Sequence, residues 1–71
     1  MKEILKDETY TLYEDEIGQK WIEVLCGSIG LYEVLVKLLP EEVDKFRKRK
    51  SFLNDLAFQI SKNPEKYKNR G

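Results

Sequence analysis

The sequence contains no histidine and only one cysteine, Cys26. An internal disulfide therefore cannot form, and a typical zinc site, which is built from Cys and His ligands, cannot be assembled. No segment approaches the ~20 consecutive apolar residues that span a bilayer, and the first residues lack the apolar core of a secretion signal. We therefore expect a soluble, cytoplasmic protein that holds no metal or other cofactor and does not bind membranes.

The chain is also short. A domain of 71 residues buries only about 60–65% of the surface that its unfolded form exposes, so its core is thin. Small domains are usually reinforced by disulfides, metals or oligomerisation. With the first two excluded, we expect residues 1–71 to form one domain that gains surface from a second copy. A domain this small has little room to enclose a substrate, so we expect no enzymatic activity and identify no catalytic residues.

Charge is divided between the two parts of the chain. Residues 1–44 hold four basic and eleven acidic side chains, a net charge of −7, whereas residues 45–71 hold nine basic and two acidic, a net charge of +7. The overall net charge of zero therefore hides a strong asymmetry. Such asymmetry orients encounters with charged partners but does not identify them.

The pattern of apolar residues changes once, near Pro40. Before it, β-branched and aromatic residues alternate with polar ones and predict strands over 9–15, 20–26 and 31–38. After it, apolar residues recur at helical spacing and predict a helix over 40–62, followed by a short tail over 63–71 that has room for one more turn. The predicted fold is α+β: a three-stranded antiparallel β-meander followed by a long C-terminal helix packed on one sheet face.

The basic run 47–50 interrupts the apolar stripe of this helix, and Ser51 is a residue type that begins helices. Two helices meeting near residue 50 are therefore an alternative to one helix. We favour one long helix that is either straight or bent near residue 50.

Alternation divides the strand residues between two faces of the sheet, and both faces are apolar. One face, the expected floor for the helix, collects Tyr10, Leu12, Ile22, Val24, Cys26, Tyr32, Val34, Val36 and Leu38. The opposite face, which we call the outer face, carries Thr11, Glu23, Glu33 and Lys37 together with the apolar set Tyr13, Trp21, Leu25, Leu31 and Leu35.

A single helix covers only one face, so the outer face is predicted to be an exposed apolar surface, and such surfaces tend to be interaction sites. We expect its apolar set to form a protein interface, with a second copy of the chain or another protein as partner. Two alternatives stay open. Either the N-terminal segment, through Ile4 and Leu5, or the C-terminal tail, through Tyr67, folds back over this face, or a one-residue error in register exchanges the two faces.

Five basic residues form the second candidate site: Lys45, Arg47, Lys48, Arg49 and Lys50. Clustered Lys and Arg side chains neutralise phosphates, which makes nucleic-acid binding an alternative function. Phe46 and Phe52 interleave with the run, but both fall in the apolar stripe of the helix and are expected to pack in the core. The −7 charge of the first part of the chain also opposes a polyanion, so we rank a protein partner above nucleic acid.

Three weaker motifs have structural interpretations. Gly27–Gly30 has the small residues of a phosphate-binding loop, but a strand follows it instead of a helix, so we expect a hairpin turn. Cys26 has no histidine to activate it and is expected to be a buried structural cysteine. Glu14–Glu16 lacks the ligand spacing of a calcium loop and is expected to be a solvated turn.

Overall fold

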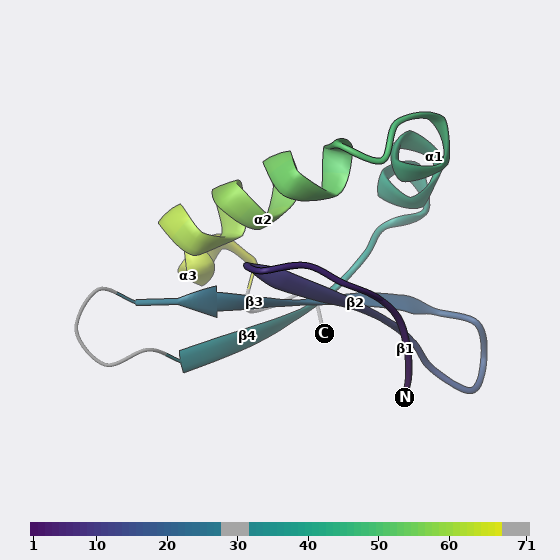
Figure 1. Ribbon diagram of the computed structural model, residues 1–71, viewed down its shortest axis with the longest axis horizontal. Coiled ribbons are helices and arrows are strands. Elements are labelled where there is room, and N and C mark those ends of the chain that lie inside the picture. The colour runs from purple at the N-terminus through teal and green to yellow at the C-terminus, as the bar shows by residue number, and fades with distance from the viewer. Residues whose placement is uncertain (28–31, 68–71) are drawn as a thin grey trace.

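A computed structural model describes residues 1–27 and 32–67. It contains one antiparallel sheet whose strands lie in chain order: β1 (Lys2–Lys6), β2 (Tyr10–Glu14), β3 (Lys20–Cys26) and β4 (Tyr32–Lys37). Three helices follow: α1 (Pro40–Lys48), α2 (Phe52–Lys62) and α3 (Pro64–Tyr67). Figure 1 shows all three helices on the same side of the sheet, so the molecule has two layers. The predicted α+β class and antiparallel sheet are confirmed.

The core lies between the sheet and the helices. Directly opposed residues of neighbouring strands share a face, and the pairs Leu12 with Ile22 and Ile22 with Val36 place three fully buried side chains on the helix side. Helix α2 closes this core with one stripe of buried residues at helical spacing: Leu53, Leu56, Ala57 and Ile60. Four half-buried residues pack around it: Val43, Phe46, Phe52 and Tyr67.

The three-stranded prediction is wrong because β1 was missed. This strand pairs antiparallel with β2 and forms one edge of the sheet. All five of its residues are exposed, so its sequence carries no alternation between buried and exposed positions. The register also slips between Glu3 and Leu5, where Ile4 is the extra residue of a bulge. Together these features remove the period-2 pattern by which strands are found.

The prediction of one long helix over 40–62 is also wrong, and the alternative of two helices meeting near residue 50 is the one that the structure shows. The chain leaves the helical conformation at Arg49, whose φ of −150° and ψ of 110° are extended. Phe46 and Leu53 both face the core, and a continuous helix would place Lys50 on the same stripe between them. The break after Lys48 instead lets α2 turn its own apolar stripe onto the sheet while Lys50 stays exposed.

Candidate functional site

The outer face is the side of the sheet opposite to the helices. Register places Tyr13, Trp21 and Lys37 in one row across β2, β3 and β4, and places Leu35 opposite Glu23 in the next row. No described helix or strand packs on this face (Figure 1). Leu25 and Leu35 keep 44% and 40% of their surface exposed there. These fractions are high for leucine in a sheet, and they leave apolar surface open on a face that no described element covers.

Trp21 is held in place by the turn that precedes it. The carboxylate of Asp15 accepts the backbone N–H of Ile17 at 3.1 Å and of Gln19 at 2.9 Å through Oδ1, and the indole N–H of Trp21 at 2.9 Å through Oδ2. Gly18 completes the turn with a φ of +85°, a conformation that glycine adopts without strain. The indole therefore lies half-buried along the sheet surface and is fixed before any partner arrives.

The hydrogen bond from Trp21 is also the main reason why the pKa of Asp15 is lowered, with further bonds from Gln19 and Ile17. Asp15 therefore stays ionised through the neutral and mildly acidic range. The acidic turn that the sequence predicted to be merely solvated thus orients one of the aromatic residues of the outer face.

A pair of carboxyl groups occupies the middle of the outer face. Glu23 lies between Tyr13, whose hydroxyl donates to Glu23 Oε1 at 3.4 Å, and the carboxyl group of Glu33 on β4. A shallow, open hollow of ≈ 200 Å³ adjoins this group and is lined in part by Lys6 and Thr11. Partial burial and then the neighbouring Glu33 carboxyl group raise the pKa of Glu23. The outer face therefore carries one acid that resists ionisation.

We expect Glu23→Gln to increase stability at neutral pH and to reduce the pH dependence of unfolding. The folded-state pKa of Glu23 lies above its unfolded value, so the wild-type protein loses stability as pH rises through the interval between the two. The measurement is the thermal midpoint at several pH values from about 4 upward. Glu16→Gln, which removes an exposed acid on the neighbouring turn, is the control for the loss of one negative charge. Equal slopes in the wild-type and Glu23→Gln proteins would contradict this assignment.

Four of the five predicted interface residues share the outer face: Tyr13, Trp21, Leu25 and Leu35. The fifth, Leu31, lies outside the described residues. Sequence reasoning missed the contribution of β1, which adds Glu3 beside Tyr13 and Lys6 beside Thr11. The available signal was the short acidic turn Asp7–Thr9, where Asp7 accepts the N–H of Glu8 and donates its own N–H to the carbonyl of Tyr10.

Within residues 1–27 and 32–67, neither of the two segments proposed to cover the outer face does so. Ile4 and Leu5 belong to β1, which extends the sheet at its edge instead of crossing it, and they remain 44% and 38% exposed. Tyr67, at the end of α3, packs against the core on the helix side. Within the described ranges, the outer face is therefore open.

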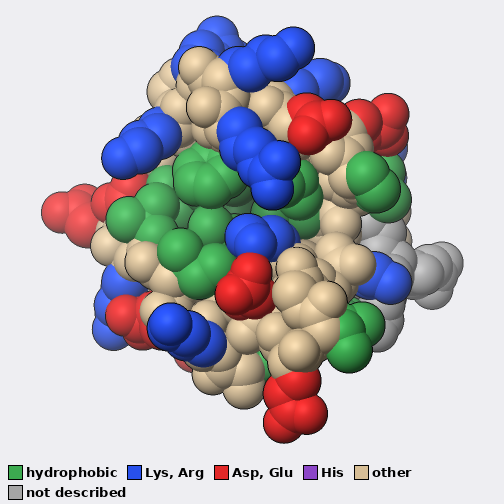
Figure 2. Space-filling view, turned by 90° about the vertical axis from the view of Figure 1, so that its right-hand side faces the viewer, with side chains coloured by type: hydrophobic (Ala, Val, Ile, Leu, Met, Phe, Trp, Pro, Cys, Tyr) green, Lys and Arg blue, Asp and Glu red, His purple; other side chains and the backbone are tan. Residues whose placement is uncertain are grey.

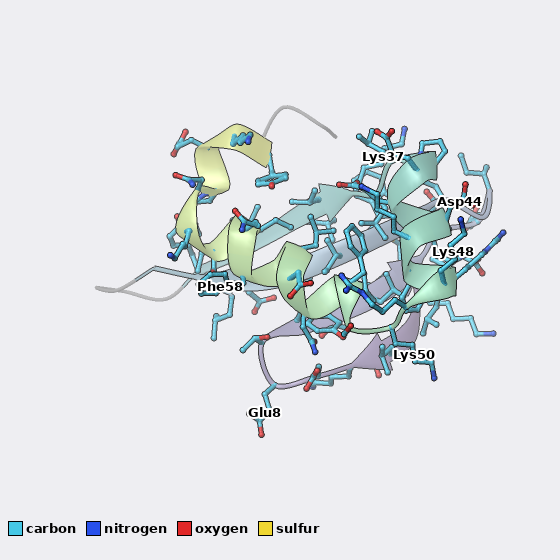
Figure 3. All side chains as sticks on the ribbon, turned by 90° about the horizontal axis from the view of Figure 1, so that it is seen from above. Glu8, Lys37, Asp44, Lys48, Lys50 and Phe58 are labelled. Atoms are coloured by element: carbon cyan, nitrogen blue, oxygen red, sulfur yellow. The ribbon has the colours of Figure 1, made fainter. Side chains whose placement is uncertain are left out.

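Residues 45–50 occupy the end of α1 and the turn that leads into α2. The five basic residues of this run are exposed, and Phe46 between them is half-buried. Figure 3 shows Lys48 and Lys50 at this end of the molecule, with Phe58 toward the other end of α2. Arg49 forms an ion pair with Asp55 at 3.2 Å, and Lys45 lies over the ring of Phe52 at 5.7 Å. Figure 2, which looks at the α1 end, shows Lys and Arg side chains around a patch of apolar surface.

Comparison with known proteins adds no candidate function. No protein-family model, curated protein or solved structure matches the chain. None of the described helices is long and apolar enough to cross a membrane. Within residues 1–27 and 32–67, no three Asp, Glu or Cys side chains gather closely enough to hold a metal ion.

Proposed function

We propose that this chain is a small interaction module, not an enzyme, that acts by binding protein, and that two copies associate through their outer faces. The observation that supports this most is the uncovered apolar set on that face: Tyr13, Trp21, Leu25 and Leu35. Tryptophan and tyrosine are the residues that most often dominate binding energy. We also propose the cytoplasm as its location, because Cys26 is a free buried thiol, as is usual in reducing compartments.

A second copy suits this surface in size and in charge. Four strands ~4.8 Å apart and about six residues long, at ~3.3 Å per residue, give a flat area of roughly 400 Å². That is at the low end for stable interfaces, which bury about 800 Å² of accessible surface per partner, so we expect a weak dimer. The face carries charges of both signs, with Glu3, Glu23 and Glu33 against Lys6 and Lys37. Mixed charge allows the same surface to meet itself without a net repulsion.

The test is sedimentation equilibrium of the wild-type protein and of Leu25→Gln at low and high salt. Leu25 is not one of the buried core residues, and a two-fold interface contains it twice, so its replacement removes two apolar contacts at once. We expect at least a tenfold weaker self-association, equivalent to about 1.4 kcal/mol. Apolar association persists at high salt, whereas a contact made by surface charges weakens.

Ile17→Gln is the matched control for this experiment. Ile17 is 88% exposed at the tip of the β2–β3 turn, so its replacement removes an exposed apolar residue beyond the ends of the strands. It should leave the association constant unchanged. If Leu25→Gln and the wild-type protein sediment identically, the outer face does not make the contact.

Nucleic-acid binding by Lys45, Arg47, Lys48, Arg49 and Lys50 is the second candidate function. The observation that favours it is the position of the run at the helix break, where all five cations are exposed. Backbone contacts by clustered cations give affinity without sequence preference, and adjacent apolar or aromatic groups can stack on unpaired bases.

If this function holds, single-stranded DNA should bind with an affinity that falls steeply as salt rises. Replacing Lys48 and Lys50 by Glu should then lower the affinity by at least about tenfold and flatten the salt dependence. Lys62 and Lys66, replaced by Glu on α2 and α3, provide a control of equal charge change. A uniform loss in both double variants would indicate attraction by net charge alone, and would contradict a site at residues 45–50.

A further inference from the structure

The two edges of the sheet are built differently. One edge is β1, which is bulged at Ile4 and has a lysine at each end of the strand. A bulge takes an edge strand out of the regular ladder and is one device by which proteins prevent such strands from pairing with other chains. The other edge is β4, which is paired with β3 in an unbroken register and, within the described residues, has no strand on its second side. The edge of β4 is therefore regular and unblocked.

The hydrogen-bonding groups on this edge can be identified from the ladder with β3. The backbone N–H of Leu38 donates to the carbonyl of Lys20 at 3.0 Å. In an antiparallel ladder, hydrogen-bonded and non-hydrogen-bonded pairs alternate, so Val36 and Val34 also direct their backbone groups toward β3. Glu33, Leu35 and Lys37 therefore direct their N–H and C=O groups away from the sheet. Their side chains lie on the outer face, where all three are exposed.

We propose that the edge of β4 pairs antiparallel with β4 of a second copy, which joins two sheets into one continuous sheet of eight strands. The register is centred on Leu35, so that each Glu33 lies directly opposite the partner's Lys37 and the two Leu35 side chains meet. On the helix side, Val34 then lies opposite the partner's Val36. Every opposed pair in this arrangement is either a pair of opposite charges or a pair of apolar residues, which are the combinations that stabilise cross-strand contacts.

Other registers lack this complementarity. Sliding one strand by two residues keeps the hydrogen-bonding pattern and centres the pairing on Val34 or on Val36. Either slide places a charged residue opposite Leu35. A further slide centres the pairing on Glu33 or on Lys37 and brings like charges together, which destabilises a sheet. Only the register centred on Leu35 satisfies both charges while forming up to about six main-chain hydrogen bonds.

The charges and the helices leave this edge accessible. In the described part of the chain, the ion pairs are those of Glu14 with Lys20 and of Arg49 with Asp55. Glu33 and Lys37 take part in neither ion pair, although the carboxyl group of Glu33 adjoins that of Glu23 and the charge of Lys37 attracts Asp15. A lysine from a partner chain would therefore place an opposite charge beside two neighbouring acids. The helix layer does not reach over the start of β4, because Tyr32 on the helix side is 44% exposed and α2 packs chiefly on β3. The helices therefore leave room for a second sheet to approach the edge of β4 near its start.

Cysteine cross-linking measures the proposed contact directly. In a Cys26→Ala background, Leu35→Cys places two thiols opposite each other with Cα atoms about 5.5 Å apart, within the range for a disulfide. We expect its oxidation to a covalent dimer to be at least tenfold faster than that of Leu25→Cys in the same background. Leu25 has a similar exposed fraction but lies on the interior strand β3. Equal oxidation rates of the two variants would overturn the proposal.

Charge reversal tests the register independently. Glu33→Lys and Lys37→Glu each place like charges opposite each other twice, so each variant alone should self-associate at least tenfold more weakly than the wild-type protein. A one-to-one mixture restores opposite charges at both positions and should form a heterodimer with the stability of the wild-type dimer. A mixture that associates no better than its components would exclude the register centred on Leu35.

This contact goes beyond the outer-face dimer and is distinguishable from it. Packed sheets lie about 10 Å apart, too far for a disulfide between two Leu35→Cys chains whose sheets face each other, since bridged Cα atoms lie within about 7 Å. Two results together would support the edge contact and reject the face contact: rapid cross-linking of Leu35→Cys, and a Leu25→Gln protein whose average mass in sedimentation equilibrium equals that of the wild-type protein. Slow cross-linking of Leu35→Cys, together with a lower average mass in sedimentation equilibrium for Leu25→Gln than for the wild-type protein, would support the face contact and reject the edge contact. If both contacts form, four copies assemble as two eight-stranded sheets packed face to face.

Discussion

Ile22→Ala is expected to destabilise the protein by about 2–5 kcal/mol, the usual cost of removing three buried carbons from a core. Ile22 is 0% exposed and lies on β3, between Leu12 on β2 and Val36 on β4. A domain of this size has a total stability of roughly 3–5 kcal/mol. The variant should therefore be largely unfolded near 37 °C, which circular dichroism during thermal unfolding will show.

Two variants keep this prediction falsifiable if Ile22→Ala does not fold. Ile22→Val removes one methyl group and should cost about 0.5–1.5 kcal/mol, a shift of several degrees in the thermal midpoint. Ile17→Ala makes the same chemical change as Ile22→Ala at a residue that is 88% exposed, and should change stability by less than about 0.5 kcal/mol. If both alanine variants have the same midpoint, β3 does not turn Ile22 toward the helices and the two faces of the sheet are reversed.

The thiol of Cys26 is expected to react with iodoacetamide about 10²–10⁴-fold more slowly in the folded protein than in the unfolded protein. Cys26 is 2% exposed, and its Sγ atom lies 3.6 Å from the carbonyl oxygen of Val24 and 4.0 Å from that of Ile60. Burial also raises the pKa of the thiol, which lowers the fraction of reactive thiolate. Reaction therefore requires opening of the domain, and a stability of roughly 3–5 kcal/mol gives a factor of this size at about 1.4 kcal/mol per tenfold.

A thiol moved by one position provides the control. In Cys26→Ala combined with Leu25→Cys, the thiol lies on the outer face, where Leu25 is 44% exposed, and should react at nearly the rate of the unfolded chain. Ile22→Val should accelerate labelling of Cys26 by the same factor by which it lowers the folding equilibrium constant. Rapid labelling of Cys26 in a protein that keeps its folded circular dichroism would show that the core does not enclose β3.

The sequence was informative wherever burial imposed a period on it. In the strands around Leu12, Ile22 and Val36, apolar and polar residues alternate because one face of the sheet is buried. In α2, apolar residues recur at helical spacing because they close the same core. The pattern failed where burial was absent. Every residue of β1 is exposed, so backbone pairing with β2 holds the strand without an apolar signature.

The helix break shows a different limit. Ser51 drew attention to residue 50, but it adopts a helical conformation, with φ of −63° and ψ of −13°, and its side chain makes no capping bond. The sequence showed that the basic run interrupts the apolar stripe, but a bent helix and two separate helices both accommodate such an interruption. The position of the sheet decides for two helices, because Phe46 and Leu53 face the core while Lys50 is exposed. For the same reason, the sequence could place Tyr13 and Trp21 on one face but could not show that the edge of β4 is unblocked.

The order of elements along the chain also bears on how the protein is made. Each strand pairs with its immediate neighbour in sequence, so the sheet can assemble from consecutive hairpins with short loops to close. The helix that covers its apolar side, α2, begins only at Phe52. During synthesis on the ribosome, the strands therefore emerge while Leu12, Ile22 and Val36 are still exposed to solvent. Until α2 leaves the exit tunnel, the nascent meander has two apolar surfaces instead of one, and this interval is when it is most exposed to chaperones and to aggregation.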